Sequence, residues 1–180
     1  MSELPDIDRD LARINDQLRR LRFASFDEHA AWEIGCDLRH RALERHAAVT
    51  IEIRLNGDTV FLHAMPGTTP ANADWARRKR NVVEWLHQPS YAVGLHAIRD
   101  GRSILDSMGL SHCDHASHGG SFPIMVQGVG CVGAVTVSGR LIAEARSVNH
   151  RFLDVRVRLP RELTDHQVFA EQAARARLSR

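Results

Sequence analysis

The sequence predicts an α+β domain in which helices pack on an antiparallel sheet. Hydrophobic residues recur with a helical period near the N-terminus, and they alternate with polar residues from residue 49 to residue 62. The expected strands follow one another through turns too short for a crossover helix, which favours antiparallel pairing. The 180 residues, 43% of them hydrophobic, suit one domain of ordinary size with a substantial core.

Two helices are expected before the first strand. The first carries one hydrophobic stripe at the spacing i, i+4, i+7, i+11 and i+14, formed by Ile7, Leu11, Ile14, Leu18 and Leu21. The second is expected to begin near Ser25 and to run to about His46. Ser25 and Glu28 have the spacing of a capping box, in which each side chain satisfies a free backbone N–H group.

A β-hairpin is predicted next, because the hydrophobic period changes to two. Val49, Ile51, Ile53 and Leu55 alternate with polar residues, and Val60 and Leu62 follow the turn. The turn itself is the dipeptide 56–57, Asn-Gly, which readily adopts the positive φ angles that a tight hairpin needs.

The remaining elements are inferred from the positions of Pro and Gly, which interrupt helices and strands, and of Ser, which can cap a helix. Residues 66–70 form a loop, and a helix is expected from about Asn72 to Leu86. Ser90 is expected to cap a further helix that reaches His96. Residues 99–120 are expected to be mainly loop with room for one short helix, and residues 122–127 and 129–138 predict two strands.

Glycines are concentrated between Ser117 and Gly139. Glycine inside a strand marks a bulge or a close approach of backbone or ligand. The stretch therefore indicates either a surface built for contact or a sheet that packs closely against helices.

The net charge and the cysteine content limit the classes of protein to which this chain can belong. The formal net charge is only +2, so the whole chain does not have the charge of a nucleic-acid binder. Residues 140–180 carry nine Arg and five acidic residues, which leaves residues 1–139 at −2. No signal core or long apolar run is visible, and Cys36, Cys113 and Cys131 form no pairing framework. A cytoplasmic protein is therefore expected.

The basic run from Arg77 to Asn81 is a candidate binding surface. On a helix Arg77 and Asn81 share one face, with Arg78 nearby, and such a face can hold a carboxylate or phosphate. It can equally be a solvated helix face. Trp75 and Trp85 are expected to be core or interface residues.

The loop at residues 118–120, His-Gly-Gly, can present backbone N–H groups to an anion. His118 could bind a metal or haem iron, or move a proton near neutral pH, or be a hydrogen-bonded structural residue. His63, on the hairpin, could face the same site.

No standard metal site or catalytic signature is expected. A dense group of potential ligands comprises His112, Cys113, His115 and His118, but its spacing fits no known pattern, and adventitious binding is the favoured interpretation. Cys131, in an apolar strand, is expected to be a small core residue. No Ser-His-Asp order, P-loop or paired-carboxylate signature is visible, so no catalytic residue is assigned and an enzymatic role stays open.

Four segments in order carry a family resemblance: residues 61–70 (FLHAMPGTTP), 72–83 (NADWARRKRNVV), 118–124 (HGGSFPI) and 128–139 (GVGCVGAVTVSG). Across about residues 10–139 the chain resembles the haem-degrading-domain superfamily (GlcG/HbpS-like), in its small cytosolic branch. The resemblance implies a three-layer, profilin-like α/β/α fold, assembly into homo-oligomers, and binding or breakdown of haem in the wider superfamily. This branch has no agreed reaction.

The resemblance ends near Gly139, and a different pattern follows. Residues 146–160 (RSVNHRFLDVRVRLP) are similar to the N-terminal segment of YicC-like endoribonucleases, of which only about forty residues are present, so no nuclease activity is implied. We expect residues 1–139 to form the domain and residues 140–180 to be a basic tail, with a strand at 153–159 and a helix from Thr164 whose docking is open. A recombined gene, a frameshift product and an engineered chimera all fit this junction.

The leading functional hypothesis is an oligomeric protein that binds a small acidic or haem-like ligand. The expected ligand-binding residues are Arg78, Lys79, Asn81, His118, Gly119, Gly120 and Phe122. Haem is the cofactor that the resemblance suggests, with its propionates on the basic helix and His118 as an axial ligand. The alternatives are a non-enzymatic assembly scaffold and an RNA-binding protein that uses its Arg-rich tail.

Overall fold

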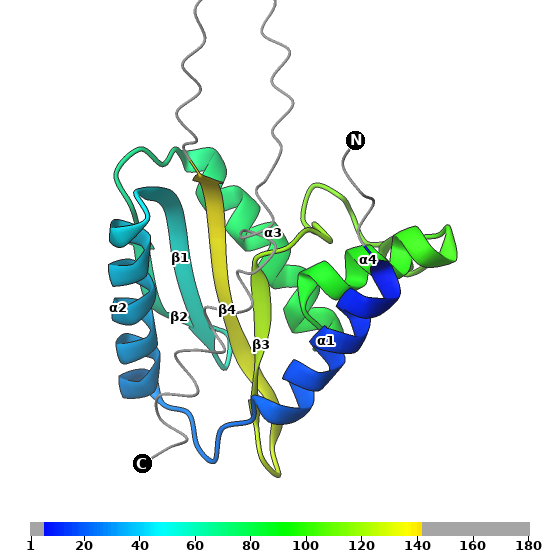
Figure 1. Ribbon diagram of the computed structural model, residues 1–180, viewed down its shortest axis with the longest axis horizontal. Helices are drawn as coiled ribbons and strands as arrows, with labels where there is room; N and C mark the ends of the chain where they lie inside the picture. Colours follow the sequence, from blue (N-terminus) through cyan, green and yellow to red (C-terminus); the bar gives the residue numbers. More distant parts are fainter. Residues whose placement is uncertain (1–5, 142–180) are drawn as a thin grey trace, which may run out of the picture.

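One antiparallel sheet organises the residues that this computed structural model describes, 6–141 (Figure 1). Its strands are β1 (Ala47–Leu55), β2 (Asp58–Ala64), β3 (Ser121–Val126) and β4 (Gly130–Leu141). They lie in the order β2-β1-β4-β3, so the longest strands occupy the centre. The expected antiparallel sheet is confirmed.

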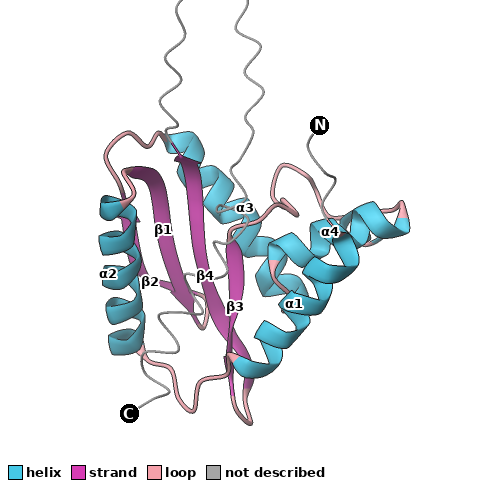
Figure 2. Ribbon diagram, in the orientation of Figure 1, coloured by secondary structure: helices cyan, strands magenta, loops and turns pink. Residues whose placement is uncertain are grey.

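Helices cover both faces of the sheet, as Figure 2 shows. They are α1 (Ile7–Arg20), α2 (Glu28–Glu44), α3 (Pro70–Leu86), α4 (Ser90–Asp100) and the short α5 (Ile104–Ser107). Helix α2 packs on β1 and β2, α3 packs on the opposite face against β4 and β3, and α1 packs on α4. The three-layer α/β/α arrangement is therefore confirmed. Within residues 6–141, no helix combines the length and the apolar character that crossing a bilayer requires.

The turns form where the sequence predicts them. Asn56 and Gly57 have φ angles of 52° and 92°, as the tight turn between β1 and β2 requires. Gly128 and Gly130 also have positive φ angles, and they flank the tip of the β3–β4 hairpin.

Two predicted helix caps are wrong. The N-cap of α2 is Asp27, whose carboxylate accepts a hydrogen bond from the Ala30 N–H group at 2.8 Å, so Ser25 lies outside the helix. A carboxylate also interacts favourably with the positive end of the helix dipole, which a hydroxyl does not. The N-cap of α4 is Pro89, and the Ser90 hydroxyl instead accepts from the Ser121 N–H group at 3.2 Å. Helix α4 also extends beyond His96, to Asp100.

The two faces of the sheet differ in chemistry. The face toward α2 is apolar and contributes to the main core, with Val49, Ile51, Ile53, Val135 and Val137. The face toward α3 carries buried polar residues, namely Thr50, Glu52, Ser121, Thr136 and Ser138. Two polar residues of the β1 alternation, Thr50 and Glu52, are therefore buried as well, because α3 covers this face. This polar layer is where the functional candidates lie.

Strand β4 runs through the junction that the sequence suggests. Gly139 pairs with Val49, and the pairing continues until Leu141 meets Ala47. The junction therefore falls inside a strand. The strand and helix that the sequence predicts at 153–159 and from Thr164 lie outside the described residues.

Candidate functional site

The basic run on α3 divides into cations with acidic partners and cations without them. Arg77 forms ion pairs with Asp74 at 3.0 Å and with Asp114 at 2.8 Å, and the pKa of its guanidinium is raised by these hydrogen bonds. Arg80 is buried and donates to Glu52 at 2.5 Å. These two arginines are neutralised locally and hold the structure together.

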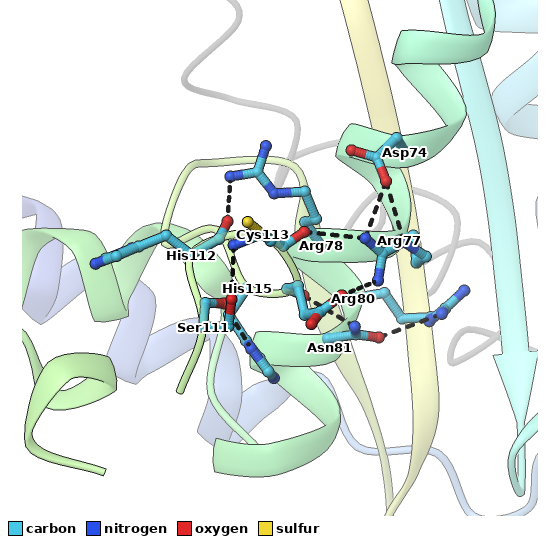
Figure 3. A network of polar contacts seen from close by, with 10 residues as sticks. Asp74, Arg77, Arg78, Arg80, Asn81, Ser111, His112, Cys113 and His115 are labelled. Atoms are coloured by element: carbon cyan, nitrogen blue, oxygen red, sulfur yellow. Dashed lines mark hydrogen bonds and ion pairs between the residues drawn. The ribbon is translucent and has the colours of Figure 1, made fainter. Parts of the chain in front are cut away.

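Helix α3 also fixes the loop that precedes β3 (Figure 3). Arg77 donates to the Cys113 carbonyl oxygen at 3.0 Å, and Arg78 donates to that of His112 at 2.5 Å. Asn81 donates to the Asp114 carbonyl oxygen at 2.9 Å. Because these bonds capture backbone carbonyls, the loop is held against the helix whatever its side chains are.

Arg78 and Lys79 differ from their neighbours, because neither has a carboxylate partner among the described residues. The Arg78 guanidinium lies 4.4 Å from the centre of the Trp75 ring, a cation–π contact. The Lys79 ammonium donates to the Ser138 hydroxyl at 3.2 Å, on the polar face of β4. Burial disfavours the charged amine and lowers the pKa of Lys79 to about 8.

The His-Gly-Gly loop lies directly over these two cations. The His118 ring meets Trp75 edge to face, with ring centres 5.3 Å apart. Gly120 has a φ of 123°, and a Cβ atom there would lie 3.3 Å from the Lys79 Nζ atom. The Gly120 carbonyl accepts from the Val137 N–H group at 2.7 Å, which ties the loop to β4.

The surroundings of His118 favour its uncharged imidazole form. Partial burial, followed by the positive charges of Lys79 and Arg78, lowers its pKa below the usual value. Neither ring nitrogen has a hydrogen-bond partner among residues 6–141, so both are available to a ligand. We name the set Arg78, Lys79, His118, Gly119 and Gly120 the anion site.

The structure thus brings together five of the seven residues that the sequence predicts for ligand binding. Asn81 is not among these five, because its side chain donates to the Asp114 carbonyl oxygen of the loop. The structure places Phe122 opposite Val135, on the other face of the sheet from Lys79. His63 pairs with Ile51 and is likewise on the α2 side.

Sequence reasoning missed two members of this neighbourhood. Trp75 contacts both Arg78 and His118, although it was expected only in a core or interface. Ser138 holds the Lys79 amine. Its signal is the pair Thr136 and Ser138, two hydroxyl residues at alternate positions of an otherwise apolar strand.

The dense group of His and Cys residues does not assemble into one site. His112 contacts Asp106 at 2.7 Å, the buried His115 contacts the Ser111 carbonyl at 3.1 Å, and His118 faces Trp75. Across the described part of the chain, no three His, Cys, Asp or Glu side chains are placed to hold a metal ion.

The three layers and the sheet order define a profilin-like α/β/α domain with its candidate site between α3 and the β3–β4 hairpin. The chain belongs to the family of haem-degrading HbpS-like proteins, whose model matches residues 26–148. A second model, the N-terminal region of YicC-like endoribonucleases, matches residues 129–180 and so overlaps the first over residues 129–148, which include β4.

Several known proteins are similar to this chain in sequence or in fold. A UPF0303 protein of Azotobacter vinelandii is 54% identical over 134 residues, which cover 74% of this chain and 81% of the relative. The crystal structure of Ybr137w protein superimposes with a TM-score of 0.71 at 19% identity, covering 92% of this chain and 88% of that one. A PduOC:Heme complex gives a TM-score of 0.60 at 15% identity, covering 84% and 94%.

Proposed function

We propose that this protein binds a small anionic ligand at the anion site. One observation carries the proposal. Arg78 and Lys79 lack carboxylate partners within the described residues, whereas Arg77 and Arg80 on either side have them. Two adjacent cations held beneath a glycine loop, one of them desolvated, are stabilised when a carboxylate or phosphate arrives.

Haem is the ligand that the family and the PduOC:Heme neighbour support. The residues present fit it. The two cations can hold propionates, and the neutral imidazole of His118 is the form that ligates iron. Trp75 and the Tyr91 ring beside Gly119 offer aromatic surface. When bound, haem supplies an iron centre for redox chemistry, while the protein positions the group and its propionate charges.

Titration with haemin and with iron-free protoporphyrin separates the two kinds of contact. Arg78→Gln is expected to weaken binding of both by about tenfold to a hundredfold, because a hydrogen bond to a charged group contributes about 1.5–3 kcal/mol. His118→Ala is expected to weaken only haemin binding and to change the Soret band. Absorbance titration measures both effects.

Arg77→Gln is the matched control, since Arg77 is on the same helix but its charge is already neutralised by Asp74 and Asp114. It should leave both affinities within about twofold. Equal effects of Arg77→Gln and Arg78→Gln would show that general surface charge, and not the anion site, attracts the porphyrin. No spectral change with either compound would reject haem as the ligand.

A second candidate function, assembly of subunits, is favoured by the edge of the sheet. β2 is an edge strand, and within the described residues nothing pairs with its outer side. Leu62 on β2 and Trp32 on α2 are 63% and 60% exposed. An uncovered edge beside large apolar side chains promotes association.

Light scattering tests this second function. Leu62→Lys is expected to reduce the oligomer mass. Val129→Lys, at the exposed tip of the β3–β4 hairpin, serves as control and should leave it unchanged. A monomeric wild-type protein would contradict the scaffold function. RNA binding by residues 140–180 stays a prediction. These residues lie within the segment that the YicC-like model matches.

A further inference from the structure

Lys79 is the only lysine in the sequence, whereas 23 other cationic side chains are Arg. Every exposed cation on the helices is therefore a guanidinium, which stays protonated in proteins. The one position with an amine is the one beneath the glycine loop. An amine differs chemically from a guanidinium in that it can lose its proton and act as a nucleophile.

The surroundings of the Lys79 amine suit that role. Its Nζ atom donates to the Ser138 hydroxyl at 3.2 Å and makes no ion pair among residues 6–141. The Gly120 backbone approaches the amine closely, since a side chain there would lie 3.3 Å from Nζ. Burial lowers the pKa to about 8, so a useful fraction of the amine is neutral near pH 7.

The charged groups around this amine favour an anionic partner. Arg78 on α3 is the other cation of the site, and its charge and that of Lys79 both act on His118 of the loop. Thr136 and Ser138 of β4 contribute hydroxyl groups to this face. Glu52 of β1 lies on the same face, but its carboxylate forms an ion pair with Arg80. A reactant with a negative group can therefore be held beside Lys79 by Arg78.

Building on the function proposed above, we propose that Lys79 forms a reversible imine with a small aldehyde or ketone whose carboxylate or phosphate is held by Arg78. The nitrogen lone pair attacks the carbonyl carbon and forms a C–N bond. Both amine protons leave with the carbonyl oxygen as water, and a C=N bond remains. No oxidant or reductant is consumed, and added water reverses the step.

Pyridoxal 5′-phosphate is a suitable probe, because it combines an aldehyde with a phosphate and its imine absorbs visible light. The full-length protein is incubated with the probe at pH 7, reduced with borohydride and mapped by mass spectrometry. Labelling of Lys79 is expected to be on the order of tenfold faster than labelling of Nα-acetyl-lysine, whose pKa is near 10.4. Labelling slower than the free amino acid would overturn the proposal and leave Lys79 a structural residue.

Matched variants test the anionic requirement. Arg78→Gln should slow labelling by pyridoxal 5′-phosphate but not by pyridoxal, which lacks the phosphate. Arg77→Gln should change neither rate. Equal loss with both probes would contradict a phosphate contact at Arg78. Because these comparisons use folded variants with Lys79 intact, they do not depend on the stability of a Lys79 variant.

The pH dependence separates this inference from the proposed function. Imine formation needs the neutral amine and should increase as pH rises through about 8, whereas porphyrin binding needs the charged amine and should weaken over the same range. A labelling midpoint near pH 10 would contradict the inference. If porphyrin binding depends on Arg78 but no imine forms, only the inference fails; if neither occurs, the anion site fails as well.

Discussion

Replacing Glu52 by alanine is expected to lower the free energy of unfolding by about 3 kcal/mol, because it leaves the buried charge of Arg80 without its main partner. The two side chains are only 9% and 11% exposed, and their ion pair measures 2.5 Å. Glu84 is a weaker second partner, 3.7 Å from Arg80 and 3.3 Å from Arg54, and it limits the loss. Urea unfolding monitored by tryptophan fluorescence measures the change.

Asp74→Ala is the control for this prediction. Asp74 pairs with a partly exposed arginine that keeps Asp114 as a second partner, so a loss below about 1 kcal/mol is expected. Equal losses for the two variants would show that the Glu52–Arg80 pair contributes no more than a surface pair. It would then follow that water reaches the layer between α3 and the sheet.

Replacing Gly120 by alanine is expected to destabilise the protein by about 3 kcal/mol and to abolish porphyrin binding. Its φ of 123° is reached readily only by glycine. A Cβ atom would also overlap the Val137 carbonyl oxygen, which belongs to the strand that anchors the loop. The loop must therefore move away from β4, and the Lys79 amine loses its cover. Calorimetry and the porphyrin titration measure the two consequences.

The neighbouring glycine provides a matched control. A Cβ atom at Gly119 would make ordinary contact with Tyr91 at 3.7 Å, and its backbone is not in the region that favours glycine. Gly119→Ala is expected to change the stability by less than about 0.5 kcal/mol. If both alanines are tolerated, the close contact between this loop and β4 is not needed for folding or binding.

Local chemistry explains which elements the sequence could predict. The Asn56-Gly57 turn and the α1 stripe depend on residues a few positions apart, and both are confirmed. The start of α2 was predicted wrongly because Ser25 and Asp27 are both good cap residues. Periodicity alone does not tell which of two caps two positions apart the chain will use.

The candidate site was only partly predictable, because its contacts join distant segments. Lys79 and Ser138 are 59 positions apart, and no local pattern links them. The basic run was visible in the sequence, but its division into paired and unpaired cations was not. That division depends on Glu52 in β1 and Asp114 in the loop, which only the tertiary fold brings to α3.

The difference in polarity between the two faces of the sheet also favours one register of its strands over the others. A shift of β4 by one residue against β1 would turn Val135 and Val137 toward α3 and Thr136 and Ser138 toward the apolar core. It would also move Gly139 away from Val49 and put a residue with a side chain in its place, where a Cβ atom would overlap the Ala48 carbonyl oxygen. Misaligned intermediates are thus penalised twice during folding. The polar layer that carries the ligand site therefore also helps the chain to reject wrong pairings.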